Sequence, residues 1–375
     1  MTAQTWPMVK LGDVANINPP APQHLPHDTI VSFLPMKNVS EDGSLVLDEC
    51  PYNGTKKGYT SLKKQDIIVA KITPCFENKK IAIAHIPNKY GFGSTEFHVI
   101  RCSEKLNNRF AFYFLRQDRI NKLGQEYMTG SAGQKRIPQT FLKDLLIPLP
   151  PLSEQKRIAA ILDKAYDLCQ LRRHALKKLD VLGEAIFHDM FRYIEKDNAN
   201  IRITKLENII EILDNMRRPI TKKDRNPGIF PYYGATGVLD YIDKYIFNEP
   251  LVLLGEDGAK WGKSEKSAYP ILGKTWVNNH AHVLKPNRKK ITDIFLIFFL
   301  NKTDLTPFVS GTTVPKLNQK NTKQIPIPLP PLAEQERFAA RIAKIEALQE
   351  HHRQALAKQE MLFQSLQQRA FRGEL

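Results

Sequence analysis

The chain has 375 residues, 42% of them hydrophobic, and its 55 Lys and Arg against 39 Asp and Glu give a net charge of +16 at pH 7. This composition excludes a disordered chain, and the longest strongly apolar run, residues 294–300, is far too short to span a bilayer. The positive charge favours a polyanionic partner, most commonly nucleic acid, over a basic protein whose lysines are merely solvated.

The cysteines and the first residues narrow the class of protein further. Cys50, Cys75, Cys102 and Cys169 show no metal-binding spacing, so neither a zinc site nor a disulfide framework is expected. The N-terminus lacks the basic and apolar regions of a signal peptide. We therefore expect a cytoplasmic protein of two or three domains.

Residues 1–150 have the pattern of a mixed α/β domain. Residues 66–72 and 97–101 are short and rich in β-branched side chains, which predicts strands. Residues 109–116 are dense in aromatic side chains, which predicts a buried helix. A polar loop over residues 129–136 then leads to a group of prolines.

A proline hinge followed by a long helix organises the chain, and it occurs twice. Residues 147–160 read IPLPPLSEQKRIAA, and residues 327–340 repeat them as IPLPPLAEQERFAA, 180 residues later. The offset holds without a gap to the Phe-Arg pairs at 191 and 371, which indicates a rigid helix because loops tolerate insertions. Since proline cannot continue a helix backwards, Ser153 is the expected N-cap of the first helix.

The two helices are expected over residues 153–192 and 333–375, each a rod of about 60 Å at ~1.5 Å per residue. Apolar residues step by three and four, the pattern of a coiled-coil seam, and the steps at Arg172 and His352 are polar. The expected seam residues are Ile158, Ile161, Ala165, Leu168, Ala175, Leu179, Leu182 and Ile186, then Phe338, Ile342, Ile345, Leu348, Ala355, Leu362 and Leu366.

One helix cannot bury such a stripe alone, so the two helices are expected to pair antiparallel within the chain, with an internal pseudo-two-fold. Packing of each helix on its own globular part, or pairing between chains, is the alternative. The expected fold class is α+β (mixed α/β), with two globular domains joined by two antiparallel coiled-coil helices. The expected boundaries are 1–150 and 197–330 for the globular domains, and 151–196 and 331–375 for the helices.

Two short motifs suggest catalysis but lack the required context. Asn18-Pro19-Pro20 is similar to the Asn-Pro-Pro-aromatic motif of amino-methyltransferases, but Ala21 follows in place of the aromatic residue, and no glycine-rich turn for S-adenosylmethionine precedes it. Residues 262–264, Gly-Lys-Ser, resemble the end of a P-loop, but Asp257 stands where the motif needs glycine.

Metal chemistry is also not expected. Asp66 with residues 77–79 fits only the loose pattern of a metal-dependent nuclease, which recurs by chance. His280 and His282 have no carboxylate or cysteine at a useful spacing, so a loop that hydrogen-bonds a base or backbone is the favoured interpretation. We therefore expect no catalytic residue and no metal ligand.

Binding chemistry remains, in several polar loops. Arg and Lys hold phosphate or read guanine, and Asn and Gln read adenine, although any single loop is more often plain surface. The candidate DNA-binding residues of the first half are Lys71, Thr73, Asn78, Lys79, Lys80, Ser94, Thr95, Gln134, Lys135 and Arg136. Those of the second half are Tyr233, Lys260, Lys263, Asn278, Asn279, His280, Thr312, Thr313 and Lys316.

The paired Pro-Leu-Pro-Pro-Leu-x-Glu-Gln hinges, each followed by a long helix, resemble the specificity subunit of type I restriction-modification enzymes. Further stretches look like that family, namely residues 72–78, 91–97, 232–237, 278–282 and 368–375. The similarity covers nearly the whole chain, and the duplicated hinge with its helix is the most specific part.

The resemblance implies two target-recognition domains that each read one half of a split, asymmetric DNA site. The helices would set the distance between them and dock two modification subunits, which carry S-adenosylmethionine and methylate adenine N6. Restriction subunits would supply translocation and cleavage driven by ATP with Mg, so this chain would bind no cofactor and catalyse nothing. The alternatives are a self-contained methyltransferase or nuclease, and a coiled-coil scaffold that binds no nucleic acid.

Overall fold

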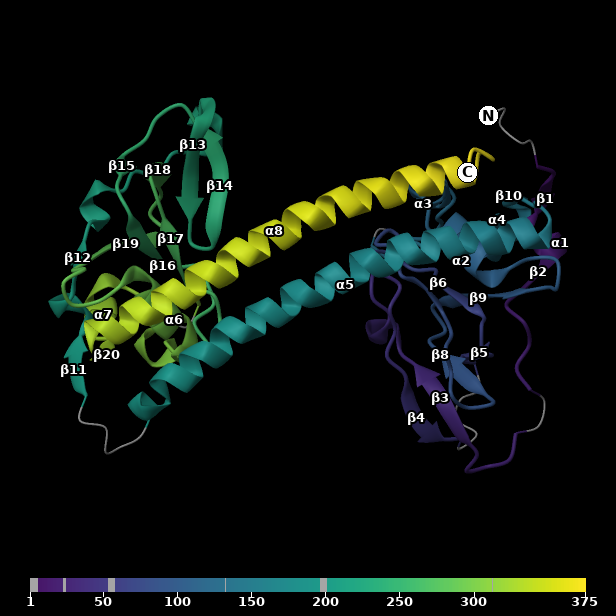
Figure 1. Ribbon diagram of the computed structural model, residues 1–375, viewed down its shortest axis with the longest axis horizontal. Coiled ribbons are helices and arrows are strands. Elements are labelled where there is room, and N and C mark those ends of the chain that lie inside the picture. The colour runs from purple at the N-terminus through teal and green to yellow at the C-terminus, as the bar shows by residue number, and fades with distance from the viewer. Residues whose placement is uncertain (1–5, 23–24, 53–57, 132, 196–200, 312) are drawn as a thin grey trace. The chain divides into compact units, whose positions relative to one another are not determined.

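The computed structural model describes residues 6–22, 25–52, 58–131, 133–195, 201–311 and 313–375. The chain divides into two compact units (Figure 1). Unit 1 contains Met1–Arg173 together with Gln354–Leu375, and unit 2 contains His174–Arg353. Each of the two long helices therefore contributes one half to each unit. Among the described residues, no helix is both long enough and apolar enough to cross a membrane.

Unit 1 contains two four-stranded sheets and a two-stranded ribbon among its described residues. The first sheet is antiparallel and has the order β2-β9-β6-β7, formed by Ala15–Ile17, Phe97–Cys102, Ile67–Ala70 and Ile81–Ile83. The second has the order β4-β3-β8-β5, formed by Asp48–Pro51, Ile30–Leu34, Gly91–Gly93 and Thr60–Leu62, with β3 and β8 parallel. The ribbon pairs β1, Met8–Lys10, with β10, Leu146–Pro148. The short helices are α1 Leu11–Val14, α2 Asn108–Leu115, α3 Asp118–Glu126 and α4 Gln139–Asp144.

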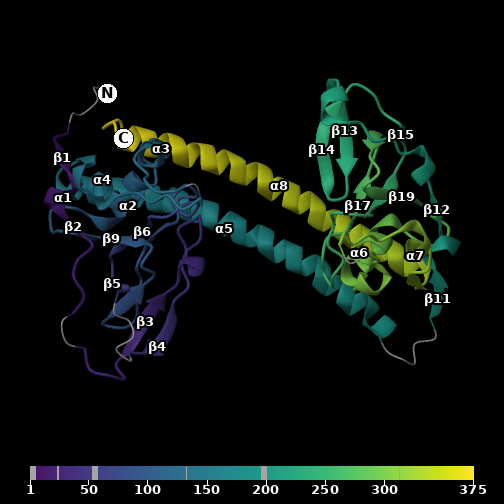
Figure 2. The same ribbon diagram turned by 180° about the vertical axis from the view of Figure 1, so that it is seen from behind.

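Unit 2, which Figure 2 shows from behind, repeats this topology strand for strand. Its first sheet has the order β12-β19-β16-β17, formed by Ile210–Ile212, Ala281–Pro286, Leu251–Gly255 and Ala268–Ile271. Its second has the order β14-β13-β18-β15, formed by Gly237–Ile242, Pro227–Gly234, Lys274–Val277 and Phe247–Asn248, with β13 and β18 parallel. The ribbon pairs β11, Arg202–Lys205, with β20, Pro326–Leu329, and the short helices are α6 Asp293–Lys302 and α7 Gln319–Lys323.

Strand β6 shows why these short apolar runs become strands. Ile67 and Val69 face the cluster formed with α2, whereas Ile68 and Ala70 face the cluster shared with the second sheet. A strand buried on both faces has no alternation of polar and apolar residues, so its sequence is a continuous apolar run. The same division occurs along β16 of unit 2. The strands and the buried helix expected near residues 66–72, 97–101 and 109–116 are thereby confirmed.

The two long helices are α5, Leu152–Phe191, and α8, Leu332–Ala370. Within unit 1, Tyr166 of α5 packs against Phe363 of α8, with ring centroids 6.2 Å apart, and Arg173 forms an ion pair with Glu360. From the first contact to the second, the residue numbers rise along α5 and fall along α8, so the two half-helices of unit 1 run antiparallel. Within unit 2, the order from Asp180–Gln349 to Phe187–Phe338 gives the same direction. The expected antiparallel pairing within one chain is confirmed, and each half-helix also packs on its own globular part.

Two expectations about these helices are wrong. Helix α5 begins at Leu152, so Ser153 lies inside its first turn and is not the N-cap. Four expected seam residues are exposed, because each helix faces a globular part as well as its partner helix and the buried stripe turns away from a strict heptad. They are Leu168, Leu182, Leu348 and Leu362, with 51%, 44%, 46% and 56% of their surface accessible.

Candidate nucleic-acid interface

Three loops of unit 1 meet at one end of the first sheet. The loop after β6 meets the loop before β9, where the backbone N–H of Lys71 donates to the carbonyl of Glu96 at 2.9 Å. The third loop is the polar stretch of residues 129–136. It closes on the first loop through two hydrogen bonds: Thr73 N–H donates to the Lys135 carbonyl at 2.9 Å, and Ile137 N–H donates to the Lys71 carbonyl at 2.8 Å. Backbone hydrogen bonds therefore hold the three loops together, and we call this arrangement the loop junction of unit 1.

Arg136 and Glu96 add a charged link between two of these loops. The Arg136 guanidinium donates to Glu96 Oε1 at 2.7 Å, and its Nε donates to Oε2 at 3.0 Å. The hydrogen bond from Arg136 is the main reason why the pKa of the Glu96 carboxyl lies below its ordinary value. Because the guanidinium is already paired, Arg136 positions the loop, and a phosphate would have to compete with Glu96 for it.

The buried imidazole of His98 anchors the third loop from below. Its Nε2 lies 2.9 Å from the carbonyl oxygen of Ile137, and its Nδ1 lies 3.0 Å from Asn18 Nδ2. Burial lowers the pKa of His98, and this outweighs the hydrogen bond to Ile137 that raises it. A neutral imidazole with its proton on Nε2 satisfies both contacts, donating to Ile137 and accepting from Asn18.

The structure brings together most, but not all, of the candidate residues of the first half. Those on the three joined loops are Lys71, Thr73, Ser94, Thr95, Gln134, Lys135 and Arg136. The turn that carries Asn78, Lys79 and Lys80 is held by other partners. Asn78 Nδ2 donates to Glu41 at 2.8 Å, and the Lys79 ammonium is paired with Asp118. Contacts to DNA by any of these residues stay a prediction.

Unit 2 forms the same junction from different residues. The N–H of Glu256, after β16, donates to the His280 carbonyl at 2.9 Å, and the N–H of Leu317 donates to the Glu256 carbonyl at 2.8 Å. His282 takes the place of His98, because its Nε2 lies 2.7 Å from the carbonyl oxygen of Leu317. Its Nδ1 lies 2.6 Å from Asp214 Oδ2, so both ring nitrogens face oxygen atoms.

Arg217 lies at the centre of this second junction. Its guanidinium contacts Glu256 at 2.5 Å, Asp214 at 3.3 Å and the Ala281 carbonyl at 2.8 Å. Only 13% of its side chain is exposed. Burial raises the pKa of the Asp214 carboxyl, but its bonds to His282 and the Val283 N–H and the charge of Arg217 bring that pKa below its ordinary value.

The same carboxylates form the one group among the described residues with the spacing of metal ligands. Atoms of Asp214, Glu256 and His282 lie within 4.8 Å of one another. The expectation that no carboxylate accompanies His282 is therefore wrong, because both acids come from distant parts of the sequence. However, Arg217 and the Lys316 ammonium, 3.1 Å from Glu256, already neutralise the acids. The geometry favours an ion-pair network over a metal site.

The candidate residues of the second half lie at different depths. Asn278 is buried, with 3% of its surface accessible, and its Oδ1 accepts from the His280 N–H at 2.8 Å, so it shapes the loop. His280 is exposed and is paired with Asp257. Tyr233 and Lys316 are half-buried, and the exposed candidates are Lys260, Lys263, Asn279 and Thr313. Thr312 lies outside the described residues.

Sequence reasoning missed the residues that hold the junctions together. Arg217 stands in an unremarkable polar stretch, and Asp214 lies 68 positions from His282. The repeat supplies one usable signal. Asn18 and Asp214 play equivalent parts, since Asn18 Oδ1 accepts from the Val99 N–H and Asp214 Oδ1 accepts from the Val283 N–H, both at 2.9 Å. Aligning the two halves strand by strand would have placed these two residues together.

Comparison with known proteins places this architecture in a family. The family model described as the type I restriction modification DNA specificity domain matches residues 3–180 and again residues 198–359. The chain belongs to this family. The match accounts for both units, and the resemblance seen in the hinges and helices is confirmed.

Relatives of known identity carry the same description. The chain is similar to the type I restriction enzyme EcoAI specificity subunit of Escherichia coli, with 40% identity over 218 residues that cover 57% of this chain and 35% of the relative. It is also similar to the EcoEI specificity subunit of Escherichia coli, with 38% identity over 199 residues that cover 52% and 33%. The matched region thus spans about a third of the length of these relatives.

A solved structure shares the fold of this specificity-domain protein. The S subunit of the type I restriction-modification system from M. genitalium superposes with a TM-score of 0.62 at 15% identity, over 99% of this chain and 96% of that one. At this identity the likeness concerns the fold alone, namely mixed helix and sheet in a duplicated arrangement with long helices.

Proposed function

We propose that this chain is the DNA-specificity subunit of a type I restriction-modification complex and that it binds a bipartite, asymmetric DNA site. One observation carries the proposal. The two units share one topology and one loop junction, but the residues at the two junctions differ. A repeated scaffold with different polar loops suits a protein that reads two unlike half-sites, because base contacts specify sequence whereas the scaffold only positions them.

Charge supports double-stranded DNA as the partner. The net charge of +16 provides the sequence-independent attraction to phosphate that underlies binding to DNA. At the first junction, Thr95, Gln134 and Lys135 are exposed and can face a duplex. Arg136 and the buried histidine hold the loops in position beneath them. The functional residues thus divide into a supporting layer and an exposed layer.

The chain is proposed to be non-catalytic. At the first junction Arg136 is paired with Glu96, and in unit 2 the candidate ligands Asp214 and Glu256 are paired with Arg217 and Lys316. S-adenosylmethionine, ATP and Mg are proposed to bind to partner subunits. Modification subunits would methylate adenine N6, and restriction subunits would translocate and cleave. Because those partners and their DNA target are cellular, we expect the chain in the cytoplasm.

Exposed apolar side chains on the long helices support the docking of partner subunits. In unit 1, Leu171 and Met361 have 66% and 63% of their surface accessible, and in unit 2 the value for Val181 is 66%. Leu168 and Leu182, near Leu171 and Val181 in the helix, are also exposed, at 51% and 44%, and contiguous exposed apolar patches are typical of protein interfaces. The helices are therefore proposed to hold two modification subunits.

Reconstitution tests this function. The purified chain is incubated with DNA and S-adenosylmethionine, alone and with the modification subunits. We expect transfer of methyl groups to adenine only in the mixture, at one bipartite sequence, and no transfer by either component alone. Methylation by the chain alone would contradict the non-catalytic role. DNA binding that does not weaken with salt would contradict the electrostatic attraction on which the proposal depends.

A further inference from the structure

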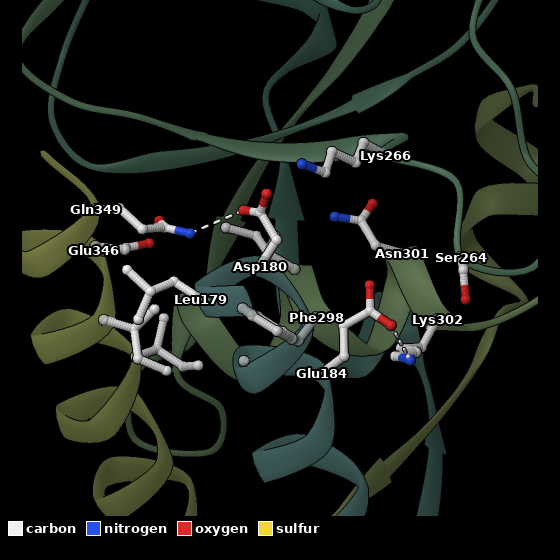
Figure 3. A pocket seen from close by; sticks show the side chains of 14 residues that line it. Leu179, Asp180, Glu184, Ser264, Lys266, Phe298, Asn301, Lys302, Glu346 and Gln349 are labelled. Atoms are coloured by element: carbon white, nitrogen blue, oxygen red, sulfur yellow. Dashed lines mark hydrogen bonds and ion pairs between the residues drawn. The ribbon is translucent and has the colours of Figure 1, made fainter. Parts of the chain in front are cut away.

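A cavity of about 250 Å³ opens between α5, α6 and α8 within unit 2 (Figure 3). Its floor is apolar and is formed by Leu179, Ile297, Phe298, Ile342 and Ile345. The volume suits one or two side chains and lies below the usual range of sites for drug-sized ligands, about 300–1,000 Å³. None of the residues that line the cavity is one of the residues that close the loop junction of unit 2, so the nucleic-acid interface does not account for it.

The repeat shows what fills the corresponding place in unit 1. Helix α8 aligns with α5 at the offset of 180 residues, so Tyr166 corresponds to Glu346 and Phe363 corresponds to Gly183. Helix α2 aligns with α6 through their caps, Asn107 and Thr292, each of which accepts from the N–H three residues on. By this alignment Tyr113 corresponds to Phe298.

Aromatic rings close the place in unit 1. The ring centroids of Tyr113 and Phe363 are 5.9 Å apart, and those of Tyr166 and Phe363 are 6.2 Å apart. In unit 2 only Phe298 of the corresponding trio is aromatic. Glycine and glutamate replace the other two rings, and Gly183, Phe298 and Glu346 all line the cavity.

Packing within unit 2 does not require the glycine. A Cβ atom added at Gly183 would meet Ile342 Cδ1 at 3.5 Å and Phe298 Cζ at 3.6 Å, which is ordinary van der Waals contact. Glycine in the middle of a helix is less stable than alanine, because its unfolded backbone has more freedom to lose. Gly183 therefore weakens the helix without being required for packing, and its lack of a side chain leaves the cavity open.

Charge at the rim indicates the chemistry of an occupant. Asp180, Glu184 and Glu346 line the cavity together with Lys266 and Lys302 (Figure 3). Lys302 is engaged, since its ammonium lies 2.9 Å from Glu184. The carboxylate of Glu346 is exposed, and no ion pair involving it is found in the described part of the chain. The rim is therefore acidic overall on a strongly basic protein.

We propose that this cavity receives an aromatic side chain that a partner subunit of the complex presents beside a lysine or arginine. The ring would take the place that Phe363 and Tyr166 fill in the first copy, and the cation would pair with Glu346. The proposal rests on the proposed function for the existence of the partner. It makes the two docking places on the chain unequal, because unit 1 fills its own cavity and unit 2 does not.

A small probe tests the chemistry of the cavity in the full-length chain. Phenethylammonium joins an aromatic ring to a cation, and phenylacetate joins a similar ring to an anion. We expect crystals or NMR spectra to place phenethylammonium between Phe298 and Glu346 at millimolar concentration, and phenylacetate to be absent. The variant Gly183→Phe fills the cavity and should abolish binding of the probe. An equal response to both probes, or binding that survives in the variant, would overturn the proposal.

Assembly with modification subunits then tests the occupant. Gly183→Phe and Glu346→Tyr each restore a first-copy residue, and both should weaken the binding of one modification subunit at least about tenfold, the size expected for loss of a buried aromatic anchor. Ala185→Phe adds the same ring at an exposed position of α5 and serves as the control. If Gly183→Phe does not fold, Glu346→Tyr at the exposed rim gives the same test. Wild-type affinity in both variants would overturn the proposal, whereas a wild-type chain that directs no methylation would refute the proposed function instead.

Discussion

Gln155 and Gln335 make the same three hydrogen bonds in the two halves of the chain. Gln155 accepts from the Asn107 N–H at 2.8 Å and donates to the carbonyls of Lys105 and Pro150 at 3.0 and 2.9 Å. Gln335 repeats this with Thr292, Lys290 and Pro330 at 2.9, 3.2 and 2.9 Å. Both side chains are buried, with 1% and 0% of their surface accessible. The glutamine of each hinge therefore ties the start of a long helix to the cap of a buried helix in the same unit.

Removal of either glutamine should destabilise its own unit. Gln155→Ala removes three hydrogen bonds between a buried side chain and the backbone, one of them fully buried, which should lower the free energy of unfolding of unit 1 by about 2–4 kcal/mol. Hydrogen exchange of the α2 amides should accelerate while that of the α6 amides stays unchanged, and Gln335→Ala should give the reverse.

Gln364→Ala is the matched control, because this glutamine lies exposed on α8. We expect its effect on stability to fall within about 0.5 kcal/mol, as for most surface substitutions. Equal effects of Gln155→Ala and Gln364→Ala would show that the buried hydrogen bonds do not hold the hinge.

Arg217 should be essential for the stability of unit 2. Arg217→Ala leaves the carboxylates of Asp214 and Glu256, with 7% and 9% of their side chains exposed, without their main cation. Breaking a buried ion pair on one side costs about 3–5 kcal/mol, which chemical denaturation measures as a loss of unfolding free energy. Arg225→Ala, which removes a more exposed pair with Asp240, should cost much less. Equal losses would remove Arg217 from the centre of the junction.

His98 should make unit 1 sensitive to mild acid. Its pKa lies below the ordinary 6.5, mainly because it is buried. Below about pH 6.5 the unfolded chain therefore binds a proton that the folded chain does not, so the stability present above that pH falls as the pH decreases toward the lowered value. His98→Gln keeps a donor for Ile137 and should flatten this slope.

The measurement compares the unfolding free energy of wild type and His98→Gln at about pH 7.5 and about pH 5.5. The pKa of His85 is lowered in the same direction, mainly by burial, so only the difference between the two proteins isolates His98. An identical pH slope in both would mean that His98 is not the group responsible.

Lys135 and Lys79 should differ in their contribution to DNA binding. Lys135 is exposed on the joined loops, whereas the Lys79 ammonium is paired with Asp118. If Lys135 neutralises one phosphate, Lys135→Gln should reduce the slope of log K against log salt by about 0.9 for every DNA sequence tested. Lys79→Gln should change the slope less, since its charge is already compensated. A slope unaffected by Lys135→Gln would place this loop away from the backbone.

The sequence predicts the parts of this fold that depend on local pattern. The two hinges and helices follow from a gap-free repeat, and strands such as β6 follow from short β-branched runs. The placement of the prolines predicts Ser153 as the cap. The start of the helix is instead held by the buried side chain of Gln155, which accepts from the N–H of Asn107, 48 positions earlier in the chain. The pattern of burial along α5 also departs from the heptad, because the helix packs both on its partner helix and on the globular parts. Leu168 and Leu182 are exposed for this reason.

The junctions could not be predicted because their contacts are distant in sequence. Asn18 meets His98 across 80 positions, and Asp214 meets His282 across 68. A periodic pattern of residues does not predict such a contact, because the contact depends on which strands become neighbours in the sheet. The boundary between the two units, in contrast, has a signal in the sequence. The helical pattern has polar steps at Arg172 and His352, and the division into units falls one residue after each.

The central claim is that each unit reads its own half of a split site. Residues 1–147 are replaced with the equivalent part of a relative, and adenine methylation is mapped at single-base resolution in cells that carry the modification subunits and either version of the chain. We expect one half of the methylated sequence to change while the other half stays as in the wild type. Simultaneous change of both halves, or of neither, would contradict the account.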